Sequence, residues 1–218
     1  MKPTPGYASE GVSQWSQLIP ARTDRAVLVG QTGSGKTTLA RYLLNARKYK
    51  VVADYKGRID WPEYRLYTSL KKLVKAKEPA LLYRPSYAES RDEDAISRFW
   101  EWIYRRGGTT AYADEITAFT NRDTYPFHYG ACLVRGREMG IEVWSATQRP
   151  TGSPQVMFSE SEHFYSFKLK LPQDRERVES FTGIPRRSIL ELPKQNFLYA
   201  RQDSGVQGPF KLQLSNNQ

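Results

Sequence analysis

The stretch RAVLVGQTGSGKTTLARYLLNARK, Arg25 to Lys48, decides the fold. It opens with an apolar run that is typical of a buried strand, passes through a glycine-rich turn and continues as a helical pattern. A strand, a glycine turn and a helix in this order begin an α/β unit, in which strands alternate with helices.

The turn itself, GQTGSGKT, satisfies the G-x-x-x-x-G-K-[ST] pattern of the P-loop. Its glycines let successive backbone N–H groups turn inward around the β-phosphate of ATP at a helix N-terminus. We expect Lys36 to place its charge on the β- and γ-phosphate oxygens and the Thr37 hydroxyl to coordinate Mg²⁺. The predicted nucleotide-binding residues are Gly30, Gln31, Thr32, Gly33, Ser34, Gly35, Lys36, Thr37 and Thr38.

Strand-like and helical segments alternate along the rest of the chain. Further strands are expected at 51–55, 65–68, 80–85, 109–115, 141–147 and 163–169. Helices are expected in the lysine-rich segment before residue 80 and at 92–108, about 129–139 and 174–183, with a terminal hairpin over 196–214. This alternation predicts a mostly parallel sheet covered on both faces, with ligands bound at the carboxyl ends of its strands. Residues 1–24 are expected to form an N-terminal arm and residues 25–218 one domain.

Composition narrows the class of protein. The 39% hydrophobic and 26% charged residues are typical of a soluble globular chain, and no apolar stretch is long enough for a membrane span. The single cysteine, Cys132, excludes an internal disulfide, and we expect it to be a small apolar helix residue. The 33 Lys and Arg against 23 Asp and Glu give a net charge of +10. This excess favours nucleic acid first and an acidic membrane second as a partner, while a solvated basic surface stays open.

Two acids follow the apolar strand TTAYADE, at Asp114 and Glu115. We expect Asp114 to hold Mg²⁺ through water and Glu115 to polarise the water that attacks the γ-phosphate. The alternative is that Glu115 only begins a helical turn as an N-terminal acid. The pair favours an ATPase over a small-molecule kinase, which would need an acceptor pocket and an arginine-bearing lid.

The run IEVWSATQRP, Ile141 to Pro150, ends a strand in polar residues. One helix separates it from the Asp-Glu strand, so its tip is expected beside the P-loop strand. Gln148 would then face the γ-phosphate or the attacking water, where an amide can both donate and accept hydrogen bonds. Arg149 would clamp the same edge or an adjacent subunit. The alternative is an ordinary polar turn after a strand.

The P-loop, the Asp-Glu pair and VRGREMGIEVWSATQRP together resemble the FtsK–HerA superfamily of DNA-pumping ATPases. In that family a helix ending in G-R-x-x-G leads to a strand ending in T/S-Q-R-P. The matching residues here are Gly136, Arg137, Gly140, Thr147, Gln148, Arg149 and Pro150. The resemblance covers roughly residues 25–183. In size the chain is similar to the genome-packaging ATPases of membrane-containing icosahedral viruses, the tectivirus-like group with double-jelly-roll capsids.

The resemblance implies a RecA-like core of the ASCE type, with one strand added between the P-loop strand and the Asp-Glu strand. It also implies assembly into a ring, a pentamer or a hexamer, in which an arginine from a neighbouring subunit completes each site. We prefer Arg137, which matches the family's helix-end arginine, and place Arg135 second. Arg175 and Arg177 are further candidates. FtsK proteins carry an arginine before the last core strand, whereas this chain has Glu162 and His163 there. We therefore expect His163 to be a strand-end residue.

The function implied is a motor that drives double-stranded DNA into a preformed capsid, in the host-cell cytoplasm or at the packaging vertex of the virion. Capsid or membrane-vertex proteins would be further partners. Lys56, Arg58 and Arg122 are expected to face the DNA, because they lie in loops that follow two of the strands. Two alternatives stay open. One is a HerA-like cellular or plasmid translocase, and the other is a nucleotide-switched assembly ATPase that binds no DNA.

Overall fold

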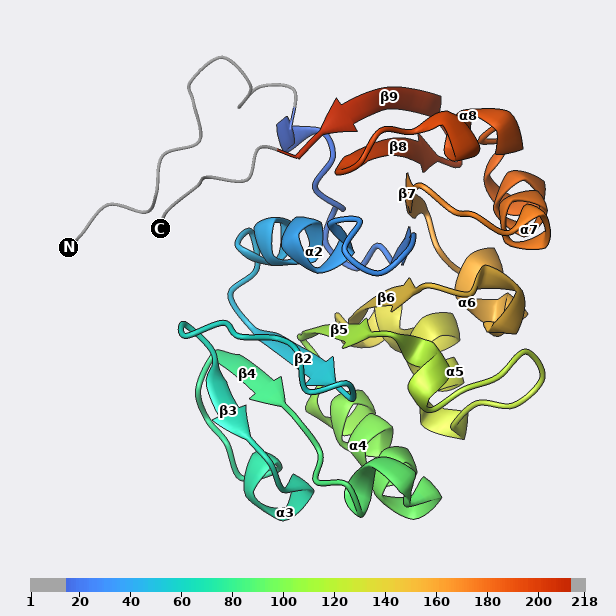
Figure 1. Ribbon diagram of the computed structural model, residues 1–218. Helices are drawn as coiled ribbons and strands as arrows, with labels where there is room; N and C mark the ends of the chain where they lie inside the picture. Colours follow the sequence, from blue (N-terminus) through green and yellow to red (C-terminus); the bar gives the residue numbers. More distant parts are fainter. Residues whose placement is uncertain (1–14, 213–218) are drawn as a thin grey trace.

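Nine strands form one sheet in the order β3-β4-β2-β5-β6-β1-β7-β8-β9 (Figure 1). The computed structural model describes residues 15–212. The strands are β1 (Ala26–Val29), β2 (Lys50–Asp54), β3 (Arg65–Tyr67), β4 (Ala80–Tyr83), β5 (Thr110–Asp114), β6 (Glu142–Thr147), β7 (His163–Phe167), β8 (Asn196–Arg201) and β9 (Gly205–Lys211). All pairings from β3 to β7 are parallel, and β8 and β9 add an antiparallel hairpin. The predicted fold class is confirmed.

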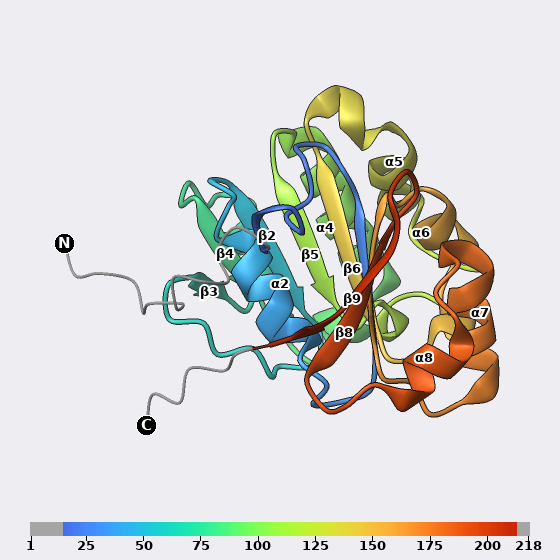
Figure 2. The same cartoon turned by 90° about the horizontal axis from the view of Figure 1, so that it is seen from above.

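Helices cover both faces of this sheet, as Figures 1 and 2 show. They are α2 (Lys36–Leu44), α3 (Leu70–Leu73), α4 (Glu93–Arg106), α5 (Phe127–Arg135), α6 (Gln155–Ser159), α7 (Pro172–Thr182) and α8 (Arg186–Glu191). Helix α2 lies on one face, and α4, α5 and α6 lie on the other. Alternate residues of β1 enter different cores, because successive side chains of a strand point to opposite faces. Val27 and Val29 join the cluster under α4 and α5, while Leu28 joins the cluster under α2.

The sequence patterns placed the strands well and the helix ends less well. The helix expected over 129–139 is α5 followed by a 3-10 turn, Gly136–Met139. A Cβ on Gly136 would lie 3.1 Å from the Cβ of Ile141, so this glycine lets the chain double back closely into β6. The lysine-rich helix α3 has only four residues. Helices α6 and α8 were not predicted, although each begins directly after a proline.

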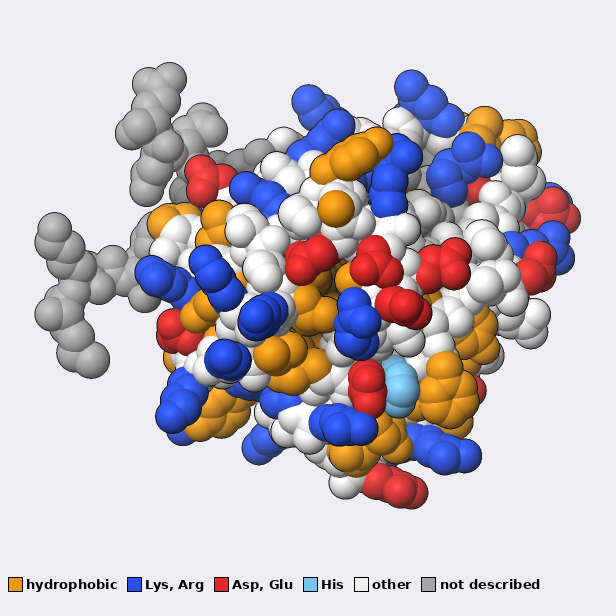
Figure 3. Space-filling view, turned by 90° about the horizontal axis from the view of Figure 1, so that it is seen from below, with side chains coloured by type: hydrophobic (Ala, Val, Ile, Leu, Met, Phe, Trp, Pro, Cys, Tyr) orange, Lys and Arg blue, Asp and Glu red, His pale blue; other side chains and the backbone are white. Residues whose placement is uncertain are grey.

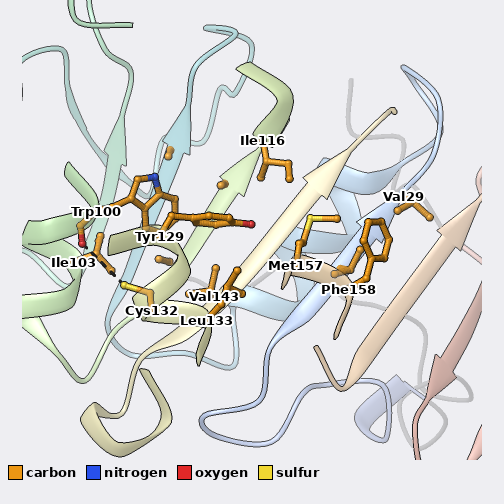
Figure 4. Close-up of a cluster of buried hydrophobic side chains, with 14 of the residues drawn as sticks. Val29, Trp100, Ile103, Ile116, Tyr129, Cys132, Leu133, Val143, Met157 and Phe158 are labelled. Carbon is orange, nitrogen blue, oxygen red and sulfur yellow. Dashed lines mark hydrogen bonds between the residues drawn. The ribbon is translucent and has the colours of Figure 1, made fainter. Parts of the chain in front are cut away.

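The larger core contains a cluster of aromatic rings between α4 and α5 (Figure 4). The rings of Trp100 and Tyr129 pack edge to face with their centroids 4.8 Å apart. Cys132 is buried beside them, and its thiol lies 4.0 Å from the Trp100 carbonyl oxygen. Burial raises the pKa of this thiol to about 12, so it stays protonated and unreactive at neutral pH. Cys132 is therefore the apolar helix residue that the sequence predicts.

The described end of the expected N-terminal arm packs on the domain. Leu18 is fully buried in the cluster under α2, and the Trp15 ring lies 5.4 Å from that of Tyr42. The Arg47 guanidinium donates to the carbonyl oxygens of Pro20 and Ala21. Residues 1–14 of the arm lie outside the described part of the chain. Within residues 15–212, no helix combines the length and apolar character needed to cross a membrane.

A buried ion pair links this segment to the sheet. Arg47 and Glu142 form a salt bridge in which the side chains are only 9% and 5% exposed, and the guanidinium lies over the Trp144 ring at 5.1 Å. Removal of one member of such a pair leaves an uncompensated charge in the interior.

We expect Arg47→Ala to lower the free energy of unfolding by about 3–5 kcal/mol, because Glu142 would remain buried without a counter-charge. Chemical denaturation of the variant and the wild type measures this difference. Arg187→Ala is the matched control, since it removes an exposed i,i+4 pair with Glu191 and should cost at most about 0.5 kcal/mol. Equal losses of unfolding free energy in the two variants would contradict the stabilising role of the buried Arg47–Glu142 pair.

Candidate active site

The carboxyl ends of β1, β2, β5 and β6 meet at one edge of the sheet and border a pocket of about 330 Å³. Strand β6 pairs with β1 on one side and β5 on the other, so it is the added strand that the resemblance implies. The pocket is lined by Thr32, Gly33, Ser34, Gly35, Lys36, Thr37, Thr38, Lys56, Arg58, Ile59, Asp114, Glu115, Gln148 and Gln195. The structure thus brings together the P-loop, the two acids and the amide that the sequence places at strand tips.

Two glycines of the P-loop leave no room for a side chain, because other residues pack closely beneath the turn. A Cβ on Gly30 would lie 2.5 Å from the Cβ of Phe167, and one on Gly35 would collide with Leu212. Both glycines have positive φ, at 155° and 113°. Side chains larger than hydrogen are excluded there, so the turn can expose its N–H groups to a ligand.

Lys36 lies across the mouth of this turn. Its Nζ donates to the carbonyl oxygens of Gly30 at 2.7 Å and Gln31 at 3.0 Å. Burial lowers the pKa of Lys36 to about 8, against the opposing effect of the nearby Glu115 and Asp114 carboxylates. Without a ligand, the charged form of Lys36 is therefore less favourable in the site than in water. Phosphate oxygens beside it would favour the charged form and raise its pKa again.

Polar atoms of the P-loop also fit a phosphate ligand. The Gln31 side-chain nitrogen and the Ser34 hydroxyl are buried and have no hydrogen-bond partner among the described residues. Buried polar groups are ordinarily satisfied, so each orphaned donor needs an explanation. Ser34 lines the pocket, and a phosphate oxygen there would accept from its hydroxyl, so a triphosphate nucleotide fits the residues present.

Asp114 connects the end of β5 to the first turn of α2. Its Oδ1 accepts from the Thr37 hydroxyl at 3.1 Å and from the Tyr112 hydroxyl at 2.7 Å. Burial raises the pKa of Asp114, partly offset by these two hydrogen bonds and the charge of Lys36. Tyr112 was not predicted as a site residue, although residues two apart on a strand share a face, so the sequence could have placed it beside Asp114.

Thr37 and Asp114 are also the pair predicted to hold Mg²⁺. Both present oxygen atoms, which this ion requires, and it commonly binds one or two protein oxygens with water and substrate phosphates completing the shell. No cluster of three or more His, Cys, Asp or Glu side chains within residues 15–212 could hold a metal without such help. The donor set therefore fits a magnesium ion that enters together with a nucleotide.

Glu115 adopts a left-handed backbone conformation, with φ 64° and ψ 76°, and begins the 3-10 turn Ile116–Ala118. Its carboxylate is buried and accepts from the Thr117 hydroxyl at 2.7 Å, the Gln148 N–H at 3.1 Å and Lys56 Nζ at 3.2 Å. Burial alone would raise its pKa, but these partners outweigh burial and the pKa falls below the ordinary value. Glu115 is thus both the start of a turn and an ionised acceptor that faces the pocket.

Gln148 faces the P-loop from the tip of β6. Its side-chain oxygen accepts from the Thr32 hydroxyl at 2.7 Å. This contact joins the strand that ends in Gln148 to the loop that would cradle the phosphates. A ligand that displaced Thr32 would therefore break this hydrogen bond and free the Gln148 amide for another partner. The sequence did not indicate the contact with Thr32, because this contact depends on the position of the P-loop turn relative to β6.

Lys56 and Arg58, predicted as DNA contacts, lie in the loop after β2 and line the same pocket. Asp54 fixes this loop: it is fully buried and accepts from the N–H groups of Arg58 at 3.1 Å and Ile59 at 3.0 Å. The structure places Lys56 against Glu115, a contact that the sequence did not indicate. Arg122 is exposed in the loop after β5, outside the pocket lining.

The preferred arginines lie at the opposite edge of the sheet. Arg137 contacts Glu162 at 2.6 Å and Asp24 at 3.8 Å, and these two acids precede β7 and β1. Arg135 is exposed at the end of α5. Neither arginine borders the pocket of its own chain. Their role in a neighbouring subunit's site stays a prediction.

The remaining candidates have structural partners. Arg175 donates to the Leu169 carbonyl oxygen at 3.1 Å, and Arg177 donates to that of Ser153 at 3.0 Å. Arg149 lies outside the nucleotide pocket and pairs with the buried Asp174 at 3.3 Å.

His163 begins β7, as expected of a strand-end residue. Its ring nitrogens lie 3.0 Å from Asp24 Oδ2 and 2.9 Å from the Tyr199 hydroxyl. The ring therefore belongs to the buried polar cluster at the amino ends of the strands and takes no part in the nucleotide pocket.

The fold and the pocket together define a P-loop ATPase with a RecA-like core. Comparison with known proteins makes the resemblance more specific. The DNA packaging ATPase P9 of Enterobacteria phage PRD1 is 28% identical over 181 residues, which cover 80% of this chain and 77% of that protein. No protein-family model matches the chain. The resemblance to the tectivirus-like packaging ATPases, inferred from the size of the chain, is confirmed.

Solved structures show the same fold. The genome packaging NTPase B204 of Sulfolobus turreted icosahedral virus 2, in complex with ATP-gammaS, has a TM-score of 0.70 at 17% identity over 86% of this chain and 97% of that chain. The pCW3 conjugation coupling protein TcpA has a TM-score of 0.57 at 13% identity, and the matched region spans 85% of this chain and 59% of that protein.

The lowered pKa of Lys36 predicts a pH-dependent affinity for nucleotide. Below pH 8 the ammonium is present before binding, whereas above pH 8 the binding of a phosphate must be accompanied by proton uptake. We expect the affinity for an ATP analogue to fall about tenfold between pH 7 and pH 9. Calorimetry or a fluorescent analogue at fixed magnesium measures it. Lys36→Met should bind weakly with a flatter pH profile, and an unchanged wild-type affinity across this range would contradict the assignment.

Proposed function

We propose that this chain is an ATP-hydrolysing translocase that packages double-stranded DNA into a preformed viral capsid as an oligomeric ring. The observation that carries the proposal is the meeting of Lys36, Asp114, Glu115 and Gln148 around one pocket at the strand tips. The packaging role is supported by the similarity to the DNA packaging ATPase of phage PRD1. Ring assembly, the arginine supplied in trans and action at a packaging vertex are parts of the same proposal.

Each residue of the pocket has a task in hydrolysis. The P-loop N–H groups and Lys36 hold the β- and γ-phosphates, and Lys36 balances negative charge that develops on their oxygens. Glu115, kept ionised by its donors, orients the attacking water and accepts its proton. Gln148, within reach of Thr32, holds the edge of the site where the terminal phosphate would lie. These side chains line one pocket, so a bound nucleotide would meet all of them at once.

Thr37 and Asp114 would hold Mg²⁺ beside the phosphates, and the ion, when bound, supplies charge neutralisation to the phosphate oxygens. Asp114 accepts from Tyr112 and Thr37, so its carboxylate is oriented toward the start of α2 before any ligand enters. The first turn of α2 would thereby be kept next to the metal-binding oxygen.

DNA is the expected polyanion because the chain carries a charge of +10 and its exposed Lys56 and Arg58 lie at the pocket edge. The positive charge is unevenly spread. On the face in Figure 3, Lys and Arg side chains gather on the side of β3 and β4, and a row of Asp and Glu crosses the middle. A ring would present some faces to DNA and others to neighbouring subunits. A HerA-like cellular or plasmid translocase and an assembly ATPase without DNA remain the competing functions.

Glu115→Gln tests the catalytic assignment. The amide keeps the shape and the accepting oxygen but cannot take up the proton, so we expect nucleotide affinity within about twofold of the wild type and turnover at least about 100-fold slower. Phosphate release and analogue binding are measured on the same preparation. Turnover near the wild-type rate would remove Glu115 from its role. Glu138→Gln, on an exposed 3-10 turn at the opposite edge, is the matched control.

The DNA part of the proposal has a separate test. Duplex DNA should raise the rate of ATP hydrolysis, and duplex affinity should fall steeply as salt is increased, because phosphate contacts release counterions. A rate that duplex DNA leaves unchanged across a salt series, together with normal nucleotide binding, would favour the assembly ATPase instead. A duplex-stimulated rate does not distinguish the viral motor from a cellular translocase, which gene neighbourhood would separate.

A further inference from the structure

A second pocket, of about 380 Å³, adjoins the nucleotide pocket and is called the side pocket below. Thr32 and Gln148 line both pockets, so the 2.7 Å hydrogen bond between their side chains belongs to the wall that the pockets share. The other residues that line the side pocket are Gln31, Arg149, Leu169, Lys170, Leu171 and Asp174, and none of these six lines the nucleotide pocket.

The Gln31 side chain carries a hydrogen-bond donor without a partner. Its amide nitrogen is buried, and no described residue accepts from it. Gln31 lines the side pocket and not the nucleotide pocket, so a nucleotide in the P-loop does not account for this donor. Buried polar groups are ordinarily satisfied, and an N–H donor is satisfied by an acceptor such as an oxygen. A ligand that brings acceptor oxygens into the side pocket would therefore fit the Gln31 amide.

Two cations against one acid make the lining of the side pocket positive. Arg149 is 57% exposed and pairs through Nε with the buried Asp174 at 3.3 Å. Asp174 also accepts from the N–H and the hydroxyl of Thr151, at 3.0 and 2.7 Å, so three donors share its charge. Lys170 is exposed, and no ion pair within residues 15–212 includes it. Lys170 is thus the cation that is left for a ligand, and the ligand it favours is an anion.

Backbone contacts hold the walls of the side pocket in place. The Gln31 N–H donates to the Lys168 carbonyl oxygen at 3.2 Å, which joins the P-loop to the segment after β7. The Arg175 guanidinium donates to the carbonyl oxygens of Leu169, at 3.1 Å, and Lys170. The Gln31 amide and the Lys170 side chain are therefore carried by backbone segments that are fixed relative to each other.

ATP hydrolysis produces an anion at the wall that the two pockets share. The oxygen of the attacking water bonds to the γ-phosphorus, and the bond from this phosphorus to the bridging oxygen breaks. ADP keeps the bridging oxygen, and the γ-phosphoryl group becomes orthophosphate. The two products are both anions and repel each other, so they separate. The proposed function places the terminal phosphate at the edge held by Gln148, and the side pocket begins on the other side of this residue.

We propose that the side pocket is a product site that binds the orthophosphate released by hydrolysis, with the Gln31 amide donating to a phosphate oxygen and Lys170 balancing the charge. This inference rests on the ATP hydrolysis of the proposed function and adds a site for one of its products. Phosphate would leave the nucleotide pocket past Thr32 and Gln148, and ADP would stay behind in the P-loop. The exposed Lys170 and Arg149 place the side pocket next to solvent, where the phosphate can depart.

The test is the binding of inorganic phosphate to the full chain loaded with magnesium and a non-hydrolysable ATP analogue. The analogue fills the P-loop, so phosphate cannot bind in the position of the γ-phosphate. Calorimetry or a phosphorus NMR titration at constant ionic strength measures the binding, and we expect one phosphate per chain. Lys170→Met should weaken phosphate binding about three- to tenfold and keep the analogue affinity within about twofold. Lys71→Met, which changes an exposed lysine on α3 outside both pockets, is the matched control and should leave both affinities unchanged.

Gln31→Met tests the orphaned donor, because methionine keeps the length of the side chain and removes the amide. We expect weaker phosphate binding to the loaded chain. Weaker analogue binding with unchanged phosphate binding would assign the amide to the nucleotide and overturn its role in the side pocket.

Three further outcomes would overturn the product site. The first is a loaded wild-type chain that hydrolyses ATP normally but binds no phosphate. The second is equal weakening in Lys170→Met and Lys71→Met, which would indicate general attraction to a basic surface. The third is a loss of duplex affinity in Lys170→Met with unchanged phosphate binding, which would make the side pocket a DNA contact. A wild-type chain that neither binds the analogue nor hydrolyses ATP would instead defeat the proposed function itself.

Discussion

One buried carboxylate, that of Glu115, joins the tips of three strands. The residue follows β5, its Oε1 accepts from the backbone of Gln148 at the tip of β6, and its Oε2 accepts from Lys56 after β2. A buried charge without such partners would be strongly unfavourable, so the three tips are held in one arrangement. The left-handed backbone of Glu115 costs about 1–2 kcal/mol for a residue with a Cβ, and these contacts offset it. The geometry of the pocket depends on this convergence.

Its neighbour Asp114 lines the same pocket but serves a different connection. The two carboxyl groups are adjacent in sequence, yet their surroundings move their pKa values in opposite directions, up for Asp114 and down for Glu115. Asp114 has two hydroxyl donors, whereas Glu115 has a backbone N–H, two hydroxyls and an ammonium. Strand β5 ends at Asp114, and the left-handed backbone of Glu115 turns the second carboxylate toward the tip of β6.

Much of this arrangement could be predicted because it is encoded locally. The P-loop carries its own flanking strand and helix, and Asp114, Glu115 and Gln148 each end an apolar run, so parallel topology alone brings them to one edge. The Lys56 contact could not be predicted in this way. It depends on how Asp54 folds the loop after β2, and Arg84, which follows β4, binds the same carboxylate.

The ends of the helices and the partners of the arginines could not be predicted from the sequence either, for related reasons. The turn at Gly136 follows from contact with Ile141, which only the folded chain reveals. Arg137 matches a family motif, but its pairing with Glu162 depends on two strand starts meeting at one edge. Periodic patterns report which face of an element is buried. They do not report which exposed cation meets which acid.

The contact between Leu212 and Gly35 has a consequence for how the chain matures on the ribosome. The phosphate-binding turn is made early in synthesis, but the side chain that packs beneath it belongs to the segment after β9. Nascent chains that lack this segment would carry the complete P-loop motif without the Leu212 side chain that packs against it. Firm nucleotide binding would therefore require the segment after β9, which is synthesised later than the strands β1 to β9.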